Sequence, residues 1–329
     1  MNIRLFALFC CISFLLFNSG TPTWAKAPST AKIVFSSNRD GNWDIWTMNP
    51  DGSDPINFTQ DAAADFSPVW SPTGEQILFV SFRKGGESLY LMDADGNNIR
   101  KVLDNWRSRS SATWSPDGKR IASVSDAVLY IATIDGKSIE PVAQTGFGSV
   151  GDPAWSPDGK EIAFIYNKRK QGYELRLLNV QTRKQKVLLG ELEKYPYKSH
   201  PAWSPDGNQI AFVLHKFRAI QNQADAIAWQ DEETIYLINR DGSQLRKLVS
   251  EKGPDALRPT WSPQGDEIIY QQEVRGFTQL FKIDVRSRVK TQLTHKGHNS
   301  RADWFDPAAL PVQPNVELLT TMWGKLKQK

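Results

Sequence analysis

A serine and an aspartate recur directly after a tryptophan along this chain, and that combination suggests a catalytic site. In PAWSPDGKEIAF (153–164), Ser156 is a candidate nucleophile and Asp158, two positions later, a candidate acid. Nucleophilic catalysis needs one serine, one base and one oxyanion site held together. The same letters recur on several segments, and equivalent copies do not serve one reaction. We therefore interpret Asp117, Asp158 and Asp206 as turn residues.

Two other motifs resemble cofactor and metal sites. GFGSVG (146–151) matches Gly-x-Gly-x-x-Gly, but a dinucleotide site needs a helix after the glycines, and here a strand pattern follows. Asp93-Ala94-Asp95-Gly96 resembles the start of a calcium loop without its twelve-residue spacing and terminal glutamate. We interpret the first as an ordinary loop and the second as a hairpin turn, and we expect no cofactor.

The tryptophan segment is an internal repeat. It reads SPVWSPTGEQILF (67–79), SATWSPDGKRIAS (111–123), DPAWSPDGKEIAF (152–164), HPAWSPDGNQIAF (200–212) and RPTWSPQGDEIIY (258–270), and a shorter RADWFDP (301–307) follows. The six tryptophans are spaced by 44, 41, 48, 58 and 43 residues. A period in the forties with four short strands per unit is typical of a β-propeller blade.

Each repeat can be divided into four strands, a to d. Strand a ends at the tryptophan, and Ser-Pro-Asp-Gly forms a tight turn because Pro presets φ and Gly supplies a positive φ. Apolar strands b and c follow, and a second Gly-containing turn leads to strand d. Pro68, Pro153, Pro201 and Pro259 interrupt strand a, which is tolerated only at a sheet edge. Strand a is therefore the inner edge of each blade.

The two ends of the repeat region complement each other. The first unit, from residue 31, has strands b, c and d without a preceding tryptophan strand, and the last has strand a alone. We predict an all-β fold, a six-bladed β-propeller over residues 31–307, in which residues 301–306 close the first blade. Residues 308–329 form a C-terminal tail whose apolar spacing is compatible with a short helix.

The N-terminus reads as a secretory signal peptide. An arginine precedes a thirteen-residue, almost wholly apolar segment (5–17) and a small-residue region, so we place cleavage after Ala25 and assign residues 1–25 to the signal. Both cysteines, Cys10 and Cys11, lie in it, so the mature chain folds without disulfides. We expect a periplasmic or secreted monomer with no membrane span in its mature form. The net charge of +4 does not favour nucleic acid as a partner.

The repeat WSPDGK-IAF, with RDG, IW-MN and DGS in the first blade, resembles that of the TolB-type propellers of the bacterial periplasm. Propellers of prolyl-oligopeptidase-like enzymes and oligogalacturonate lyases carry similar repeats. The resemblance covers residues 31–307 and implies a propeller and an envelope-associated role. It concerns the propeller alone: we expect neither the α/β domain that precedes it in TolB-type proteins nor a hydrolase domain, since Gly-x-Ser-x-Gly is absent.

Candidate binding residues are those that vary within the repeat. Three positions before each tryptophan stand Ser67, Ser111, Asp152, His200, Arg258 and Arg301, which form a polar ring if strand a lines the channel. The b–c and d–a loops share one face and vary most; the longest are 190–200, with Tyr195 and Tyr197, and 216–233, with Trp229. Aromatic loops suit contact with a protein or a glycan.

Two functions remain open from the sequence. The first is a non-enzymatic scaffold that binds a protein partner, for example an envelope protein, or a glycan through the loop-rich face. The second is a metal-dependent lyase of oligogalacturonate type, or another propeller hydrolase. Its metal candidates are His200, His295 and His298, which approach one mouth of the channel. Metal analysis of the purified protein would separate these functions.

Overall fold

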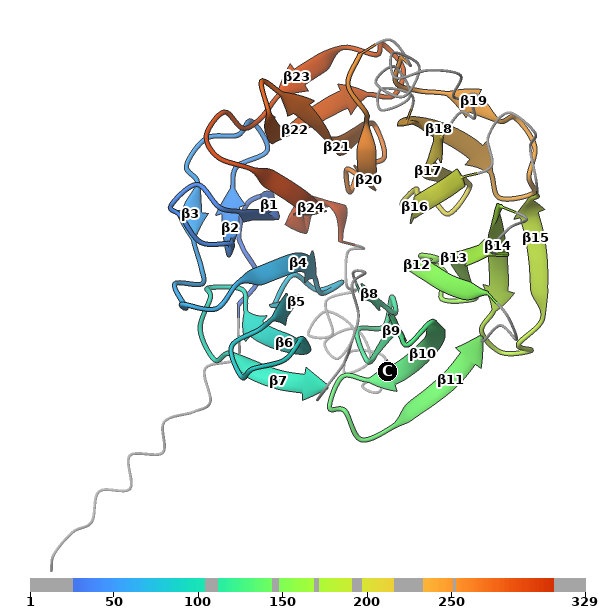
Figure 1. Ribbon diagram of the computed structural model, residues 1–329, viewed down its shortest axis with the longest axis horizontal. Coiled ribbons are helices and arrows are strands. Elements are labelled where there is room, and N and C mark those ends of the chain that lie inside the picture. The colour runs from blue at the N-terminus through green and yellow to red at the C-terminus, as the bar shows by residue number, and fades with distance from the viewer. Residues whose placement is uncertain are drawn as a thin grey trace, which may run out of the picture.

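The innermost strand of every blade carries the repeated tryptophan at or next to its last residue, and the other three strands follow outward from the channel. The computed structural model describes residues 26–103, 112–143, 148–168, 172–190, 197–215, 233–250 and 253–310. Within these ranges the chain forms six antiparallel sheets of four strands each, arranged around a central axis (Figure 1). The prediction of an all-β, six-bladed propeller is confirmed.

From the channel outward, the strand order follows the sequence in blades 2 to 6, whereas in blade 1 the C-terminal strand is innermost. Blade 1 contains β24 (Asn299–Phe305), β1 (Lys32–Ser37), β2 (Asp44–Met48) and β3 (Ile56–Asn57). Blade 2 contains β4 (Asp65–Trp70), β5 (Gln76–Ser81), β6 (Ser88–Asp93) and β7 (Arg100–Leu103). Blade 3 contains β8 (Thr113–Trp114), β9 (Arg120–Ser125), β10 (Val128–Thr133) and β11 (Ile139–Ala143).

The second half of the ring repeats this order. Blade 4 contains β12 (Ser149–Trp155), β13 (Glu161–Asn167), β14 (Tyr173–Asn179) and β15 (Gln185–Leu189). Blade 5 contains β16 (Tyr197–Trp203), β17 (Gln209–His215), β18 (Glu233–Asn239) and β19 (Arg246–Lys247). Blade 6 contains β20 (Leu257–Trp261), β21 (Glu267–Val274), β22 (Phe277–Asp284) and β23 (Lys290–Gln292).

The Ser-Pro-Asp-Gly segments are turns between the first two strands of a blade. Between β12 and β13, Ser156 Oγ donates to Asp158 Oδ1 at 2.7 Å, and the Lys160 amide donates to the same oxygen at 3.1 Å. Ser156 Oγ also accepts from the Glu161 amide at 2.9 Å, and Gly159 has a φ of 73°. The serine and aspartate thus stabilise the hairpin, which confirms their interpretation as turn residues.

The C-terminal strand closes the ring as predicted. β24 pairs with β1, with Trp304 opposite Ile33 and Phe305 opposite Lys32 (Figure 1). The Phe305 ring packs on Trp70 of blade 2 at 5.7 Å between centroids. The strand starts two residues before the predicted range and ends one residue earlier; a short 3-10 helix, η3 (Pro307–Ala309), follows because Asp306 accepts from the Ala308 amide.

The hydrophobic core lies between the blades. Each of six buried clusters joins the inner strands of two neighbouring blades, and a repeated tryptophan belongs to or packs against each one. Trp203, for example, belongs to one cluster with Ala163 of blade 4 and Ile210 of its own blade and is 8% exposed. Removing such a side chain costs about 3–5 kcal/mol. The repeat is therefore a packing unit that joins each blade to the preceding one.

Two predicted segments lie outside the described residues. These are the signal peptide (1–25) and the part of the tail after Leu310, so both stay predictions. Within the described ranges, no helix has the length and apolar character required to span a membrane.

Candidate functional site

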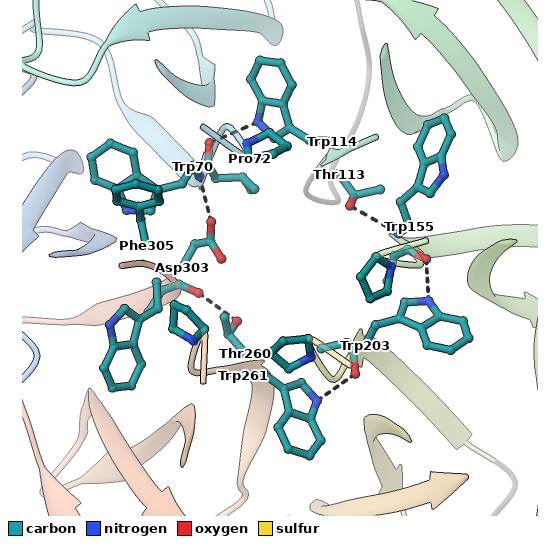
Figure 2. A pocket seen from close by; sticks show the side chains of 18 of the residues that line it. Trp70, Pro72, Thr113, Trp114, Trp155, Trp203, Thr260, Trp261, Asp303 and Phe305 are labelled. Atoms are coloured by element: carbon teal, nitrogen blue, oxygen red, sulfur yellow. Dashed lines mark hydrogen bonds between the residues drawn. The ribbon is translucent and has the colours of Figure 1, made fainter. Parts of the chain in front are cut away.

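The inner strands enclose a cavity of ≈ 520 Å³ on the axis of the propeller (Figure 2). Its wall is made by the tryptophans of the six inner strands and by the prolines of the turns that follow, Pro72, Pro116, Pro157, Pro205 and Pro263. Ala309 and Leu310 of the closing segment also line it. The cavity thus reaches from the middle of the inner strands to the side of the a–b turns. The loop-rich face, where we expected a partner from the sequence, lies on the opposite side.

A ring of residues with unusual backbone geometry lies in the inner strands. Ser67, Asp152, His200, Arg258 and Arg301, all three positions before a tryptophan, have φ between 49° and 56°. The pairing register shifts at this position in each of the five strands, which marks a β-bulge. Non-glycine residues rarely adopt this φ, and such strain and bulges concentrate at functional sites, where they redirect a side chain.

Four of these residues line the cavity: Asp152, His200, Arg258 and Arg301. They stand on four consecutive blades, from blade 4 round to blade 1. The sixth ring position, Ser111, lies outside the described residues. The structure therefore brings the charged members of the ring together on one side of the channel.

The ring residues differ in their hydrogen bonds. Asp152 Oδ2 accepts from the His200 amide at 3.1 Å and lies 4.0 Å from His200 Nε2. Arg301 Nη1 donates to Ser67 Oγ at 2.7 Å. Arg258 lies between them on blade 6, and no hydrogen bond or close ion pair to its guanidinium is found among the described residues.

Burial shifts the pKa values of the ring. It lowers the pKa of His200 to about 4. The negative charge of Asp152 raises this pKa and the positive charges of the nearby arginines lower it, so that His200 is neutral at pH 7. Burial lowers the pKa of Arg258, which Asp152 partly opposes. For Arg301, burial and then repulsion by Arg258 lower the pKa to about 10. Both guanidinium groups stay charged at pH 7, in a place that disfavours their charge.

The residue just before each tryptophan connects neighbouring blades. In three blades it is Val69, Ala154 or Ala202, and its carbonyl accepts from the indole Nε1 of the next blade's tryptophan. These three hydrogen bonds measure 3.4, 3.0 and 3.1 Å, and Figure 2 shows them around the cavity. A buried indole N–H usually finds such a partner.

In the other three blades this residue is Thr113, Thr260 or Asp303, and its own side chain makes the connection. Thr113 Oγ1 accepts from the next tryptophan's amide at 3.3 Å, and Thr260 Oγ1 donates to the Ala302 carbonyl at 2.9 Å. Asp303 Oδ2 accepts from the Trp70 amide at 2.7 Å (Figure 2). Burial raises the pKa of Asp303 to about 6 despite this bond. Sequence reasoning missed Asp303, although it is the one acid at this repeat position.

The remaining candidates lie away from the cavity or outside the described residues. Tyr197 is 41% exposed and packs on Tyr173 at 5.0 Å and on His215 at 5.5 Å between ring centroids. His215 Nδ1 in turn lies 2.9 Å from Glu233 Oε1. Tyr195 and Trp229 fall outside the described part of the chain, so their role stays a prediction.

The three candidate metal ligands do not lie together. His200 lines the cavity, whereas His298 Nδ1 accepts from the Thr278 amide at 3.2 Å and its ring lies 5.1 Å from that of Phe277. His295 is exposed. Among the described residues, no three His, Cys, Asp or Glu side chains are grouped so that they could hold a metal ion.

Sequence reasoning also missed an aromatic row on the loop-rich side. The rings of Phe277, His298, Trp43, Phe66 and Phe82 follow one another with centroid separations of 5.1, 6.4, 5.3 and 6.3 Å. The members come from three blades, and Phe82 and Phe277 are 43% and 48% exposed. These residues do not occupy one equivalent position of the repeat, so the sequence period does not predict that they lie together.

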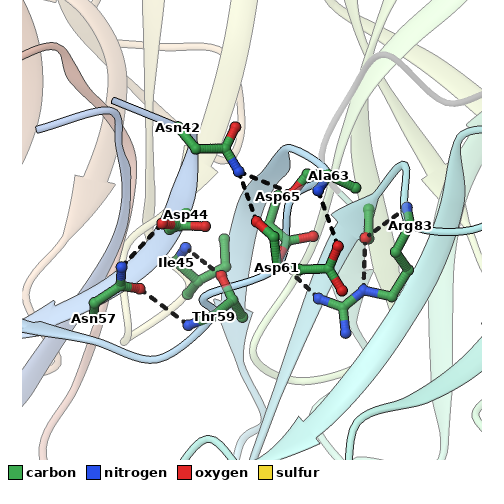
Figure 3. Close-up of polar contacts among 10 residues, drawn as sticks. Asn42, Asp44, Ile45, Asn57, Thr59, Asp61, Ala63, Asp65 and Arg83 are labelled. Carbon is green, nitrogen blue, oxygen red and sulfur yellow. Dashed lines mark hydrogen bonds and ion pairs between the residues drawn. The ribbon is translucent and has the colours of Figure 1, made fainter. Parts of the chain in front are cut away.

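A polar network beside this row holds the loops of blade 2 and the connection that leads to it from blade 1 (Figure 3). Arg83 Nη2 lies 2.8 Å from Asp65 Oδ2, whose pKa burial raises although Arg83 acts to lower it. Asn42 Nδ2 donates to the carbonyls of Asp61 and Ala63 at 2.9 and 3.2 Å. These contacts fix loops between blades, and a structural role accounts for them.

A family model described as the TolB beta propeller domain matches residues 12–128, 87–223 and 125–308. Together these matches span most of the chain and include all six repeats. The chain belongs to the TolB β-propeller domain family.

Solved structures agree with this TolB-type assignment at the level of fold. TolB from Acinetobacter baumannii is 18% identical with a TM-score of 0.70, over 86% of this chain and 68% of that one. A putative TolB from Agrobacterium tumefaciens is 17% identical with a TM-score of 0.60, over 83% and 92%. An oligogalacturonate lyase in complex with manganese is 18% identical with a TM-score of 0.54, over 82% and 74%. No curated protein matches the chain in sequence.

Proposed function

We propose that this TolB-type propeller is a non-enzymatic scaffold that acts in the periplasm and binds a protein partner at its central cavity. One observation carries the proposal: the walls of the cavity repeat from blade to blade, whereas its charged ring does not. The tryptophans and prolines of the wall are explained by packing and turn formation. Asp152, His200, Arg258 and Arg301 are explained by neither, and they sit in a strained conformation.

The cavity favours binding over catalysis. A concave site with apolar walls and a few convergent polar groups is the usual form of a binding site. The repeated serines and aspartates are engaged in their turns, as shown for Ser156 and Asp158. The alternative, a metal-dependent lyase, would need a metal ion bound by His200, His295 and His298, and these three side chains do not lie together. The match to a manganese-containing lyase concerns the fold alone.

Family membership supports the periplasm as the site of action. TolB-type propellers are periplasmic, and the first residues of this chain have the charge, apolar core and small-residue end of a signal peptide. Both cysteines fall in that segment, which suits an oxidising compartment. Fractionation of cells that express the full chain tests this part, and recovery of the protein in the cytosol would contradict it.

The partner site is tested by blocking the cavity. Leu310 lines the cavity and is 38% exposed, whereas Ile139 is 47% exposed on β11, the outer strand of blade 3. We expect the tagged full chain to capture a defined envelope protein, Leu310→Arg to lose it, and Ile139→Arg to retain it. Equal capture by both variants would contradict binding at the cavity. Loss with Tyr197→Ala instead would place the partner on the loop-rich face.

A further inference from the structure

We propose that residues 311–329, which follow the last described residue, dock across the mouth of the cavity on the side of the a–b turns. The described chain ends at Leu310, which lines the cavity and is 38% exposed. The segment therefore starts at the mouth, and its first five residues can carry it at most about 18 Å away. The inference deepens the proposed function and rests on it in one respect, because a partner at the cavity would have to displace this segment.

The mouth of the cavity has an apolar rim. The rim consists of the lining prolines of five a–b turns and of Leu310, namely Pro72, Pro116, Pro157, Pro205, Pro263 and Leu310. A Cβ added to Gly159 or Gly207 would meet the proline of the preceding turn at 3.8 or 3.5 Å, so neighbouring turns lie side by side around the mouth. Pro116, Pro157 and Pro205 are exposed although they line the cavity. Exposed apolar surface around a cavity is typical of a binding site.

The turns that form the rim are acidic, whereas the segment is basic. Asp117, Asp158 and Asp206 each follow a rim proline directly and are exposed, and Arg240 offsets part of the charge of Asp158 at 3.0 Å. Eight acids and three bases occur in the turn segments 71–76, 115–120, 156–161, 204–209 and 262–267 together with Asp306. Residues 311–329 contain one acid and three lysines, Lys325, Lys327 and Lys329. Opposite charges therefore favour docking on this side of the propeller.

The sequence of the segment also predicts an apolar face that needs a surface to pack against. Its apolar residues recur every three or four positions, as on one face of a helix: Val316, Leu319, Met322, Trp323 and Leu326. A helix of this length is marginal in water by itself, and Gly324 weakens it further. The rim is the apolar surface at which the segment begins, and the short tether keeps the segment at a high effective concentration there.

Limited proteolysis of the purified protein measures docking, because Lys325 and Lys327 are trypsin sites within the segment. Trp323→Asp places a charge on the predicted apolar face, and Thr321→Asp places the same charge on the opposite face as a matched control. A docked segment is cut only while it is released, and burial of one large apolar side chain corresponds to at least about tenfold in an equilibrium constant. We expect Trp323→Asp to be cut at least about tenfold faster than the wild type, and Thr321→Asp at the wild-type rate. Equal rates in the two variants would overturn the docking.

The place of docking is tested from both sides. A photoreactive amino acid at position 323 should form adducts with the a–b turns of the same chain, as mapped by mass spectrometry. Pro116→Arg on the rim should speed cleavage of the segment, whereas Phe277→Arg, at a 48% exposed position on the loop-rich side, should not. Adducts with other parts of the chain, adducts between two chains, or no adducts would overturn the docking. Far-ultraviolet circular dichroism confirms that each variant is folded before it is compared.

The docking and the proposed function fail separately. If a partner binds at the cavity, Trp323→Asp should capture more of it than Thr321→Asp, because the segment no longer competes for the rim. Slow cleavage and adducts with the a–b turns, without any captured partner, would support the docking and contradict the scaffold. Capture that Leu310→Arg abolishes, together with equal cleavage of the two segment variants, would support the scaffold and contradict the docking.

Discussion

The pH dependence of stability should depend on Asp303 in a direction opposite to that of most carboxylates. Burial raises the pKa of Asp303 from 3.8 to about 6, which corresponds to about 3 kcal/mol at 1.36 kcal/mol for each pKa unit. Between these two pH values the folded chain holds this proton and the unfolded chain does not. The contribution of Asp303 to stability is therefore complete below pH 3.8 and is lost as the pH rises to about 6.

Asp303→Asn removes this titration and keeps an oxygen that accepts from the Trp70 amide. Relative to the wild type, the free energy of unfolding of the variant should rise by up to about 3 kcal/mol between pH 4 and pH 7. Urea denaturation followed by tryptophan fluorescence at half-unit pH steps measures this difference. Most of the change should fall between pH 4 and pH 6.

Asp135→Asn is the control for this experiment. Asp135 is half-exposed in a turn, where hydrogen bonds from the Thr133 hydroxyl and the Lys137 amide lower its pKa to about 2. Its contribution is present above pH 3.8 and is lost only as the pH falls towards 2, so this variant should differ from the wild type by a constant amount between pH 4 and pH 7. A constant difference for Asp303→Asn as well would refute the reasoning about its burial.

Three further predictions concern closure and the ring. A Cβ on Gly74 would lie 2.2 Å from the Phe305 ring, whereas a Cβ on Gly118, at the same turn position of blade 3, would have its nearest atom 3.9 Å away. Gly74→Ala should therefore lower the free energy of unfolding by roughly 1–3 kcal/mol more than Gly118→Ala, as measured by chemical denaturation. In a Phe305→Ala background this difference should disappear. Deletion from β24 onward should lower Tm far more than deletion after β24, because it removes the inner strand of blade 1; equal values would contradict closure. In low salt and without ligand, Arg258→Gln should unfold at the same temperature as the wild type or higher, since it removes repulsion of Arg301; a lower Tm would show that the arginine is structural.

The sequence predicts the fold well because each repeat carries its own local signals. The turn around Ser156 and Asp158, the inner edge marked by prolines, and the closing strand around Trp304 all follow from residue types and spacing. The spacing also places Asp152 and Arg258 in one ring. The sequence does not predict the bulge and the positive φ there, since serine and arginine, which rarely adopt that conformation, stand at the same repeat position as aspartate and histidine.

Other features depend on contacts between blades. Asp303 differs from its repeat neighbours in sequence, but its raised pKa follows from burial in the joint between blades 1 and 2. The aromatic row from Phe277 to Phe82 joins residues of three blades that no periodicity connects. The cavity itself was expected only as a channel, and its extent toward the Ser-Pro turns emerges from the packing of side chains.

Photo-cross-linking in living cells tests partner binding at the cavity most directly. A photoreactive amino acid replaces Leu310 at the cavity or Ile139 on β11 in the full chain, and both positions are exposed. We expect a discrete adduct with an envelope protein from position 310 and none from position 139. The same adduct from both positions, or from neither, would contradict a partner at the cavity.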